Sequence, residues 1–297
     1  MSDPAIQLSV ADGIASLVFD QPNSRANVLS TALWTEFGKT LDGLVRRPDI
    51  KGLTLASAKP GIFIAGADLK ELANADPANP GLTRAYVELG LRVLDTLEAL
   101  PFPTVSLIDG AALGGGLEVV LACDFRLCGT SAKLQLGAPE IKLGLMPGWG
   151  GSQRLPRLVG VEEAINRLLS GESYDATDPP PDDLVDETVP SEQLSEAGLR
   201  WLATGDWLEV REAKRSPVPA DMLPSADFLA ETRQTLDLID EPMKPAAAEI
   251  LKVVLEGSLT DLKAGIRLET AAFLRLAGTP NSRELIADFF ARRKKSV

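Results

Sequence analysis

The first 130 residues alternate between strand-like and helix-like segments, and this alternation constrains the fold more than any other feature. Apolar runs of five or six residues are typical of buried strands, whereas a 3.6-residue period indicates amphipathic helices. We expect strands at 6–10, 14–19, 52–56, 104–108 and 124–128. We expect helices at 27–45, 83–100 and 117–122, with Ser30 as a candidate N-cap. Such alternation predicts an α/β fold with covered sheets.

Strands become rare after about residue 161. Residues 175–183 form an acidic, proline-rich segment that predicts an irregular loop, and the three prolines in 216–224 suggest a hinge or linker. Helical patterns cover residues 162–169, 245–255, 259–276 and 282–293. We therefore predict a core over residues 1–200 and a helical C-terminal region over residues 201–297.

Composition limits the chemistry. The 297 residues carry a net charge of −12, which argues against nucleic-acid or anionic-membrane binding. The sequence has no histidine, so imidazole bases, Ser-His-Asp catalysis and histidine-ligated zinc are excluded. Proton transfer must then use other groups, and carboxylates become the leading candidates.

The two cysteines, Cys123 and Cys128, match neither a CxxC motif nor a zinc-ligand set. Cys123 follows an apolar helical segment, so we expect a buried free thiol. The N-terminus lacks the basic and apolar regions of a secretory signal, and no apolar run approaches about 20 residues. These features suggest a reducing compartment, and we expect a cytoplasmic protein without a membrane span.

A stretch of 53 residues, 108–160, holds most of the candidate chemistry. Glycines 114–116 lead into an apolar helix with Glu118 in its first turn, and Glu140 follows 22 residues later. Backbone N–H groups at such a helix start can bind a developing oxyanion, and two carboxylates can form an acid–base pair. The alternatives are close helix–strand packing for the glycines, an exposed first-turn position for Glu118 and a surface or capping role for Glu140.

Two further glycine-containing segments, residues 65–68 and 147–154, also carry candidate site residues. Residues 65–68 place small side chains at a loop–helix junction, where amide N–H groups can reach a carbonyl, although for this segment alone a tight turn that needs glycine is the favoured explanation. Residues 147–154 form a second glycine-rich turn before a helix. Ser152 is a candidate N-cap there, and Trp149 could line an acyl chain. No nucleotide-binding glycine motif is present.

Four segments resemble the crotonase superfamily, specifically the enoyl-CoA hydratases: NVLS, AGADLKE, GAALGGGLEVVLACDFRL and PEIKLGLMPGWGGSQRLPRLVG. The resemblance is clear over roughly residues 5–165 and fainter through the C-terminus. VFDQPNSRANVLS and GIRLETAAFLRLAGTPNSRELIADFFARRKK are similar to the hydratase part of multifunctional fatty-acid oxidation enzymes. The resemblance implies a spiral of ββα turns with a helical C-terminal region that assembles trimers or hexamers.

The resemblance also assigns site residues. It implies that the N–H groups of Ala67 and Gly115 form an oxyanion hole and that Glu118 and Glu140 hold and activate water. Gly148 would lie beside the two carboxylates. Coenzyme A, as part of the substrate, would run along Ala65, Ala67, Asp68, Leu69 and Lys70. Phe289 and Arg292 match positions that contact the nucleotide end in a neighbouring subunit.

The leading function is hydration of a trans-2-enoyl-CoA to a 3-hydroxyacyl-CoA in fatty-acid oxidation, with no metal and no cofactor beyond the substrate. A Δ3-Δ2 enoyl-CoA isomerase, which needs mainly one carboxylate, is the second hypothesis. A non-catalytic binding or scaffold relative is the third, and the acidic charge argues against an RNA-associated form. A separate 3-hydroxyacyl-CoA dehydrogenase would be a partner. The segment 174–185 departs from the helical stretch usual in relatives, which affects acyl-chain access.

Overall fold

The computed structural model describes residues 3–203 and 206–295, which form two compact units. Unit 1 contains the described residues within 1–67, 89–137 and 174–213. Unit 2 contains the described residues within 68–88, 138–173 and 214–297. Two helices and one short strand continue from one unit into the other. The predicted division at residue 200 stays a prediction, and residues 204–205 and 296–297 of its C-terminal region lie outside the description.

Unit 1 is built on two sheets. The larger has the strand order β1-β2-β3-β5-β7-β10, and the smaller has the order β4-β6-β8-β9. The strands of the larger sheet are β1 Ile6–Ala11, β2 Ile14–Phe19, β3 Gly52–Ser57, β5 Thr104–Ile108, β7 Phe125–Gly129 and β10 Glu187–Val189. Those of the smaller sheet are β4 Gly61–Ile64, β6 Gly110–Leu113, β8 Gln135–Gly137 and β9 Ser173–Tyr174.

The chain alternates between these sheets. β3, β5 and β7 are parallel neighbours in the larger sheet, and the strand after each of them, β4, β6 or β8, joins the smaller sheet in parallel. A helical segment follows each pair: α2 Leu69–Leu72, α4 Gly115–Ala122 or the 3-10 helix η1 Pro139–Leu143. Three ββα turns therefore repeat along the chain, which confirms the predicted α/β spiral.

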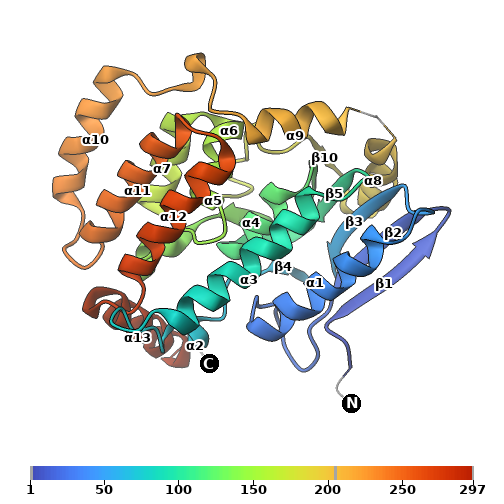
Figure 1. Ribbon diagram of the computed structural model, residues 1–297, viewed down its shortest axis with the longest axis horizontal. Coiled ribbons are helices and arrows are strands. Elements are labelled where there is room, and N and C mark those ends of the chain that lie inside the picture. The colour runs from blue at the N-terminus through green and yellow to red at the C-terminus, as the bar shows by residue number, and fades with distance from the viewer. Residues whose placement is uncertain (1–2, 204–205, 296–297) are drawn as a thin grey trace. The chain divides into compact units, whose positions relative to one another are not determined.

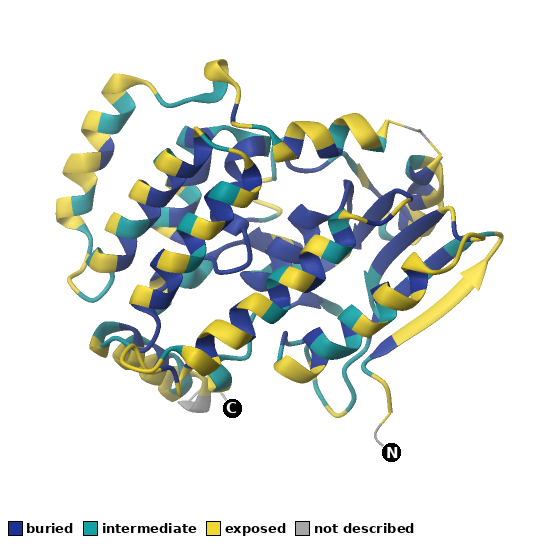
Figure 2. Ribbon diagram, viewed as in Figure 1, coloured by how far each residue is buried: buried dark blue, intermediate teal, exposed yellow. Residues whose placement is uncertain are grey.

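The strands predicted at 6–10 and 14–19 are confirmed as β1 and β2, which pair antiparallel as a hairpin. Asp12 and Gly13 have φ angles of 52° and 83°, as a two-residue turn between twisted strands requires. β5 and β7 are buried along their whole length, as expected for parallel strands covered on both faces. β1, the edge strand, is exposed after its first residue (Figure 2).

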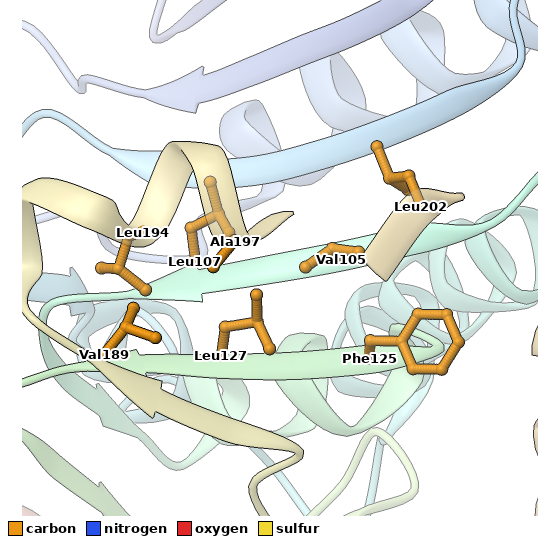
Figure 3. Close-up of a cluster of buried hydrophobic side chains, with 8 residues drawn as sticks. All are labelled: Val105, Leu107, Phe125, Leu127, Val189, Leu194, Ala197 and Leu202. Atoms are coloured by element: carbon orange, nitrogen blue, oxygen red, sulfur yellow. The ribbon is translucent and has the colours of Figure 1, made fainter. Parts of the chain in front are cut away.

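Helices cover the larger sheet. Unit 1 holds α1 Thr31–Val45, the second half of α3 Gly81–Glu98, α8 Leu194–Leu202 and most of α9 Trp207–Arg215. The side chain of Ser30 accepts a hydrogen bond from the N–H of Leu33, which confirms the predicted N-cap. α8 packs on β5, β7 and β10 through one apolar cluster (Figure 3): Val105, Leu107, Phe125, Leu127, Val189, Leu194, Ala197 and Leu202.

Unit 2 is mainly helical, as predicted for the C-terminal part of the chain. Its later helices are α10 Ala226–Leu238, α11 Lys244–Ser258, α12 Leu262–Leu276 and α13 Pro280–Lys295. Its earlier helices are α5 Gly151–Arg154, α6 Pro156–Val159 and α7 Val161–Ser170. α11 packs against α12 and α7, and α10 lies along the outer side of α11 (Figure 1).

Several local predictions are corrected. The strand β4 was not predicted, and α1 begins at Thr31 instead of residue 27. Ser152 lies inside α5, whose N-cap is Gly150. Residues 216–224 are not a free linker, because Val218 is buried and its N–H donates to the carbonyl oxygen of Ser258 at 2.8 Å. Residues 175–183 are irregular, as predicted.

Candidate active site

Ala67 and Gly115 follow neighbouring parallel strands. Ile64, the last residue of β4, pairs with Ala112 of β6. Ala67 comes three residues after Ile64, and Gly115 comes three residues after Ala112. Both residues therefore leave the smaller sheet at the carboxyl ends of adjacent strands, within unit 1.

Glycines bring these two connections into close contact. A Cβ on Gly116 would lie 2.2 Å from the carbonyl oxygen of Ile64, and one on Gly66 would lie 3.0 Å from the carbonyl oxygen of Leu113. Gly114 has a φ of 53° and Gly66 a φ of 109°, which favour glycine. The packing alternative for the glycine triplet is thus correct for Gly116, and it places the start of α4 against the end of β4.

The start of α4 offers backbone donors. Gly114 is the N-cap and makes no side-chain cap hydrogen bond, and the helix begins at Gly115. The N–H groups of the first turn of an α-helix have no partner within the helix, and the helix dipole adds positive potential there. The N–H of Gly115 belongs to this set, so the position suits a developing negative charge on oxygen.

A buried asparagine fixes the strand connection before Ala67, and the sequence analysis did not single it out. Asn27 has no exposed surface, and its carbonyl oxygen accepts from the N–H of Ala65 at 2.9 Å. Its side chain bonds Phe19 O at 3.2 Å, Ser57 Oγ at 2.9 Å, Phe63 O at 3.0 Å and Gln21 N at 2.9 Å. The only signal in the sequence is its place in the NVLS segment.

Glu118 lies in the first turn of α4, as predicted. Its exposed fraction is 2%, so the alternative of an exposed, dipole-compensating glutamate is wrong. Every residue of α4 is buried. Burial of a carboxylate is unusual outside functional and paired sites, so Glu118 stays a candidate catalytic residue.

Glu140 lies in unit 2, in the 3-10 helix η1, and is half-buried. Its carbonyl oxygen accepts from the N–H of Leu145 at 3.0 Å, and Gly144 closes the helix with a φ of 64°. Glu118 belongs to unit 1. That the two carboxylates share one water stays a prediction.

The residues assigned to coenzyme A have mixed surroundings. Ala65 and Lys70 are exposed, and Ala67, Asp68 and Leu69 are half-buried. Asp68 caps α2 by accepting from the N–H of Lys70 at 2.9 Å, and its own N–H donates to the hydroxyl of Tyr86 at 3.2 Å. Asp68 therefore has a structural function, and the coenzyme A path stays a prediction.

Gly148 and Trp149 lie in a buried turn of unit 2. A Cβ on Gly148 would lie 3.0 Å from the ring of Phe273 on α12, so this ring fills the space beside the glycine. The indole N–H of Trp149 donates to the carbonyl oxygen of Val87 at 3.1 Å, and the ring meets Tyr86 edge-on at 5.2 Å. The turn is thus anchored to α3 and α12.

The carboxylate that holds this turn was missed. Glu269, fully buried on α12, accepts from the N–H of Gly150 at 2.6 Å and from the N–H and hydroxyl of Ser152 at 3.0 and 2.6 Å. A signal existed, because Glu269 occupies a core-facing position among Ile266, Ala272 and Phe273 in a helical pattern.

The C-terminal contact residues lie on α13. Phe289 is half-buried and meets Phe290 edge-on at 5.9 Å, and Arg292 is exposed. Their contact with a nucleotide stays a prediction. Among the described residues, no three acidic or thiol side chains gather as a metal-ion site would require. Within residues 3–203 and 206–295, no helix has both the length and the apolar character needed to cross a membrane.

Residues 9–204 match the family described as Enoyl-CoA hydratase/isomerase. The chain belongs to this family. The sequence is also 36% identical over 279 residues to the fatty acid oxidation complex subunit alpha of Aliivibrio fischeri, and 35% identical over 286 residues to that of Shewanella amazonensis. These matches cover 94% of this chain but 40% of each relative.

Solved structures share the fold. An enoyl-CoA hydratase from Bacillus anthracis is 28% identical, with a TM-score of 0.62 and 97% of both chains covered. Human mitochondrial delta3-delta2-enoyl-CoA isomerase has a TM-score of 0.70, with 99% of both chains covered, at 22% identity. The chain is a domain of the enoyl-CoA hydratase/isomerase family, in the crotonase superfamily, and is homologous to alpha subunits of the fatty acid oxidation complex.

Proposed function

We propose that this chain hydrates trans-2-enoyl-CoA thioesters to 3-hydroxyacyl-CoA. The observation that carries the proposal is the pair of parallel connections that follow β4 and β6. They place the backbone of Ala67 and Gly115 at one edge of the smaller sheet, with Glu118 one turn into the helix that Gly115 begins. Glu140 follows the next strand of that sheet, β8, by three residues.

The chemistry begins at C3 of the substrate. Glu118 takes a proton from water while the water oxygen forms a bond to C3. The electron pair of the C2–C3 double bond moves toward the thioester, and negative charge develops on its carbonyl oxygen. The N–H groups of Ala67 and Gly115 stabilise this charge, each by about 3 kcal/mol.

A second carboxyl group completes the addition. Glu140, in its protonated form, delivers a proton to C2 as the carbonyl is restored, so the elements of water are added across the double bond. Exchange of one proton with solvent restores the starting states of Glu118 and Glu140. Because both steps use carboxylates and backbone amides, the reaction needs neither histidine nor a metal, and coenzyme A enters only as part of the substrate.

Activity on crotonyl-CoA tests the proposal through the loss of absorbance of the conjugated thioester. We expect Glu118→Gln and Glu140→Gln each to reduce kcat by about 10²- to 10⁴-fold, the usual contribution of a general acid or base. Glu256→Gln, on the exposed surface of α11, is the matched control. Full activity in both site variants would refute the assignment, and turnover of 3-enoyl-CoA alone would identify an isomerase.

Further parts of the proposal concern setting and partners. The structure records Cys123 and Cys128 as buried free thiols, which supports a reducing compartment such as the cytoplasm. We propose a homo-trimer or hexamer in which Phe289 and Arg292 reach a neighbour's nucleotide, with no nucleic acid or membrane as partner. Light scattering after size-exclusion chromatography tests the assembly.

The relatives suggest the reaction that follows. The alpha subunits matched here are named for a fatty acid oxidation complex, and this chain spans about 40% of their length. We propose that the 3-hydroxyacyl product passes to a separate 3-hydroxyacyl-CoA dehydrogenase. A coupled assay with such an enzyme and NAD, with nicotinamide reduction as the signal, tests that order. No nicotinamide reduction in the coupled assay, although hydration proceeds, would contradict it.

A further inference from the structure

Glu269 is a buried carboxylate on α12, outside the residues assigned to catalysis. Its two oxygens accept three hydrogen bonds where the turn meets the start of α5: from Gly150 N at 2.6 Å, Ser152 N at 3.0 Å and Ser152 Oγ at 2.6 Å. Backbone N–H groups at a helix start need an outside acceptor, and a carboxylate is a strong one. Glu269 therefore fixes both the position and the direction of this turn.

The turn depends on that outside support. Gly150 has a φ of 96° and no side chain to hold it. From the following helix, the guanidinium of Arg154 donates to the carbonyl oxygen of Trp149 at 2.6 Å. Trp149 thus lies between two buried polar anchors, one from α12 and one from α5, so its backbone has little freedom.

Trp149 passes this constraint to α3. Its indole N–H donates to Val87 O at 3.1 Å, and its ring meets that of Tyr86 at 5.2 Å with an interplanar angle of 80°. The hydroxyl of Tyr86 accepts from the N–H of Asp68 at 3.2 Å. Asp68 directly follows Ala67 in the sequence. A continuous series of contacts within unit 2 thus runs from Glu269 to Asp68.

We propose that Glu269 is a positioning residue that sets acyl-chain selectivity by holding Trp149 against Tyr86. This inference rests on the proposed function and on the sequence-based prediction that Trp149 lines the acyl chain. Glu269 touches no substrate in this scheme and acts through the turn. When the turn is held less firmly, Trp149 can move aside for a longer acyl chain, so kcat/KM for a long-chain substrate rises. The kcat/KM for a short-chain substrate does not rise.

Selectivity is the decisive readout because it does not depend on the fraction of folded enzyme. We measure kcat/KM for trans-2-decenoyl-CoA and for crotonyl-CoA with the same preparation and take their ratio. In Glu269→Gln one acceptor becomes an NH2 donor that faces other donors, so we expect the ratio to rise at least about threefold. Ser152→Ala removes one of the three hydrogen bonds, and we expect a smaller rise.

The control comes from the same helix. Arg275 on α12 pairs with Glu249 on α11 at 2.8 Å, away from the turn, so Arg275→Gln perturbs the packing of α12 without touching Gly150 or Ser152. We expect its ratio to equal that of the wild type. A wild-type ratio in both Glu269→Gln and Ser152→Ala, whatever their melting temperatures, would overturn the inference.

A second measurement is independent of activity. Fluorine NMR of protein labelled with 5-fluorotryptophan separates the signals of the four tryptophans, and Trp149→Phe identifies the signal of Trp149. We expect Glu269→Gln to shift or broaden that signal and to leave the Trp34 signal unchanged. An unchanged Trp149 signal would refute the positioning role. If the wild type hydrates neither substrate, the proposed function fails, while this spectrum still decides whether Glu269 holds Trp149.

Discussion

Gly116 at the start of α4 lies directly against the backbone of Ile64 at the end of β4, where an added Cβ would come within 2.2 Å of the carbonyl oxygen. Neither backbone can give way easily, because Ile64 is held in the sheet and Gly116 in the helix. This contact keeps the donor at Gly115 beside the connection that carries Ala67. The geometry of the proposed oxyanion hole therefore depends on the absence of one methyl group.

Gly116→Ala is expected to destabilise the protein and to lower its activity. Overpacking of a buried contact typically costs about 1–3 kcal/mol, and relief of this one requires α4 to move away from β4. We expect kcat on crotonyl-CoA to fall at least about tenfold in the folded variant, because a small displacement of the donor weakens its hydrogen bond to the oxyanion. Urea unfolding and hydration kinetics measure the two effects.

Gly43→Ala on α1 is the matched control, since nothing lies within 4 Å of its added Cβ and the site is exposed. This change should stabilise the protein by about 0.5–1 kcal/mol, because alanine is the better helix former, and should leave kcat unchanged. Equal effects of the two substitutions would show that the contact with Ile64 is unimportant.

Asn27→Ala is expected to cost about 2–4 kcal/mol of unfolding free energy. The asparagine side chain satisfies several buried groups at once, among them the carbonyl oxygens of Phe19 and Phe63. Each buried polar group left without a partner costs about 1–3 kcal/mol. The main-chain carbonyl oxygen of residue 27, which accepts from the N–H of Ala65, remains in the variant, but without the side-chain bonds its position is less fixed, so we expect a loss of activity as well.

Asn166→Ala on the exposed surface of α7 provides the comparison for Asn27. Its unfolding midpoint in urea should match that of the wild type. A midpoint for Asn27→Ala as high as that of Asn166→Ala would mean that the buried hydrogen bonds of Asn27 contribute little.

The long strands and helices were predictable because their signals are local. Residues 104–108 follow two prolines and have the sequence TVSLI, which is rich in β-branched and aliphatic side chains, and the structure places β5 over this range. Strands β6 and β8 were missed because they have four and three residues and include glycine and alanine, which have low strand propensity. β6 pairs with β4 and β8 pairs with β6, and both pairings arise from tertiary contacts that no local pattern records.

In the candidate site, too, local sequence patterns predict some features, and tertiary contacts determine the others. The glycines before Glu118 and the apolar residues after it predict its position in the first turn of a helix. Its burial, however, depends on the sheet against which α4 packs. Ser152 has the composition of an N-cap, yet Glu269, 117 residues away, takes the capping role and draws the serine into the helix. A competing partner from a distant segment leaves no trace near Ser152.

Arg211→Met is expected to destabilise unit 1 by about 3–5 kcal/mol. The guanidinium of Arg211 on α9 bonds Asp124 at 2.6 and 2.8 Å and the carbonyl oxygen of Phe102 at 2.9 Å, and both side chains are almost fully buried. Removal of one member of a buried pair leaves the other charge uncompensated, and that residual charge dominates the cost.

The double substitution Arg211→Met with Asp124→Asn removes the charge that remains. We expect it to recover part of the stability lost in Arg211→Met, although Asp124 also accepts from the N–H and hydroxyl of Thr104. Urea unfolding measured for both single variants and the double variant gives the coupling energy. Strict additivity of the two losses would contradict a direct ion pair.

Cys128 is expected to resist thiol reagents and to make stability depend on alkaline pH. Burial raises the pKa of its thiol from 9.0 to about 12. A raised pKa in the folded state stabilises the protein while the thiol of the unfolded chain is still protonated, below about pH 9. This stabilisation decreases as the pH rises toward 12, by at most about 4 kcal/mol in total.

Two measurements check Cys128. Labelling with an aromatic disulfide reagent at pH 8 should be negligible in the native protein and should proceed once urea unfolds it. The unfolding free energy should decrease between pH 8 and pH 10.5 more steeply in the wild type than in Cys128→Ala, which lacks the group but retains every other titrating side chain. The difference between the two pH profiles gives the contribution of the Cys128 thiol alone, because lysines and tyrosines titrate in both proteins. Parallel profiles would show that this thiol does not contribute to the pH dependence of stability.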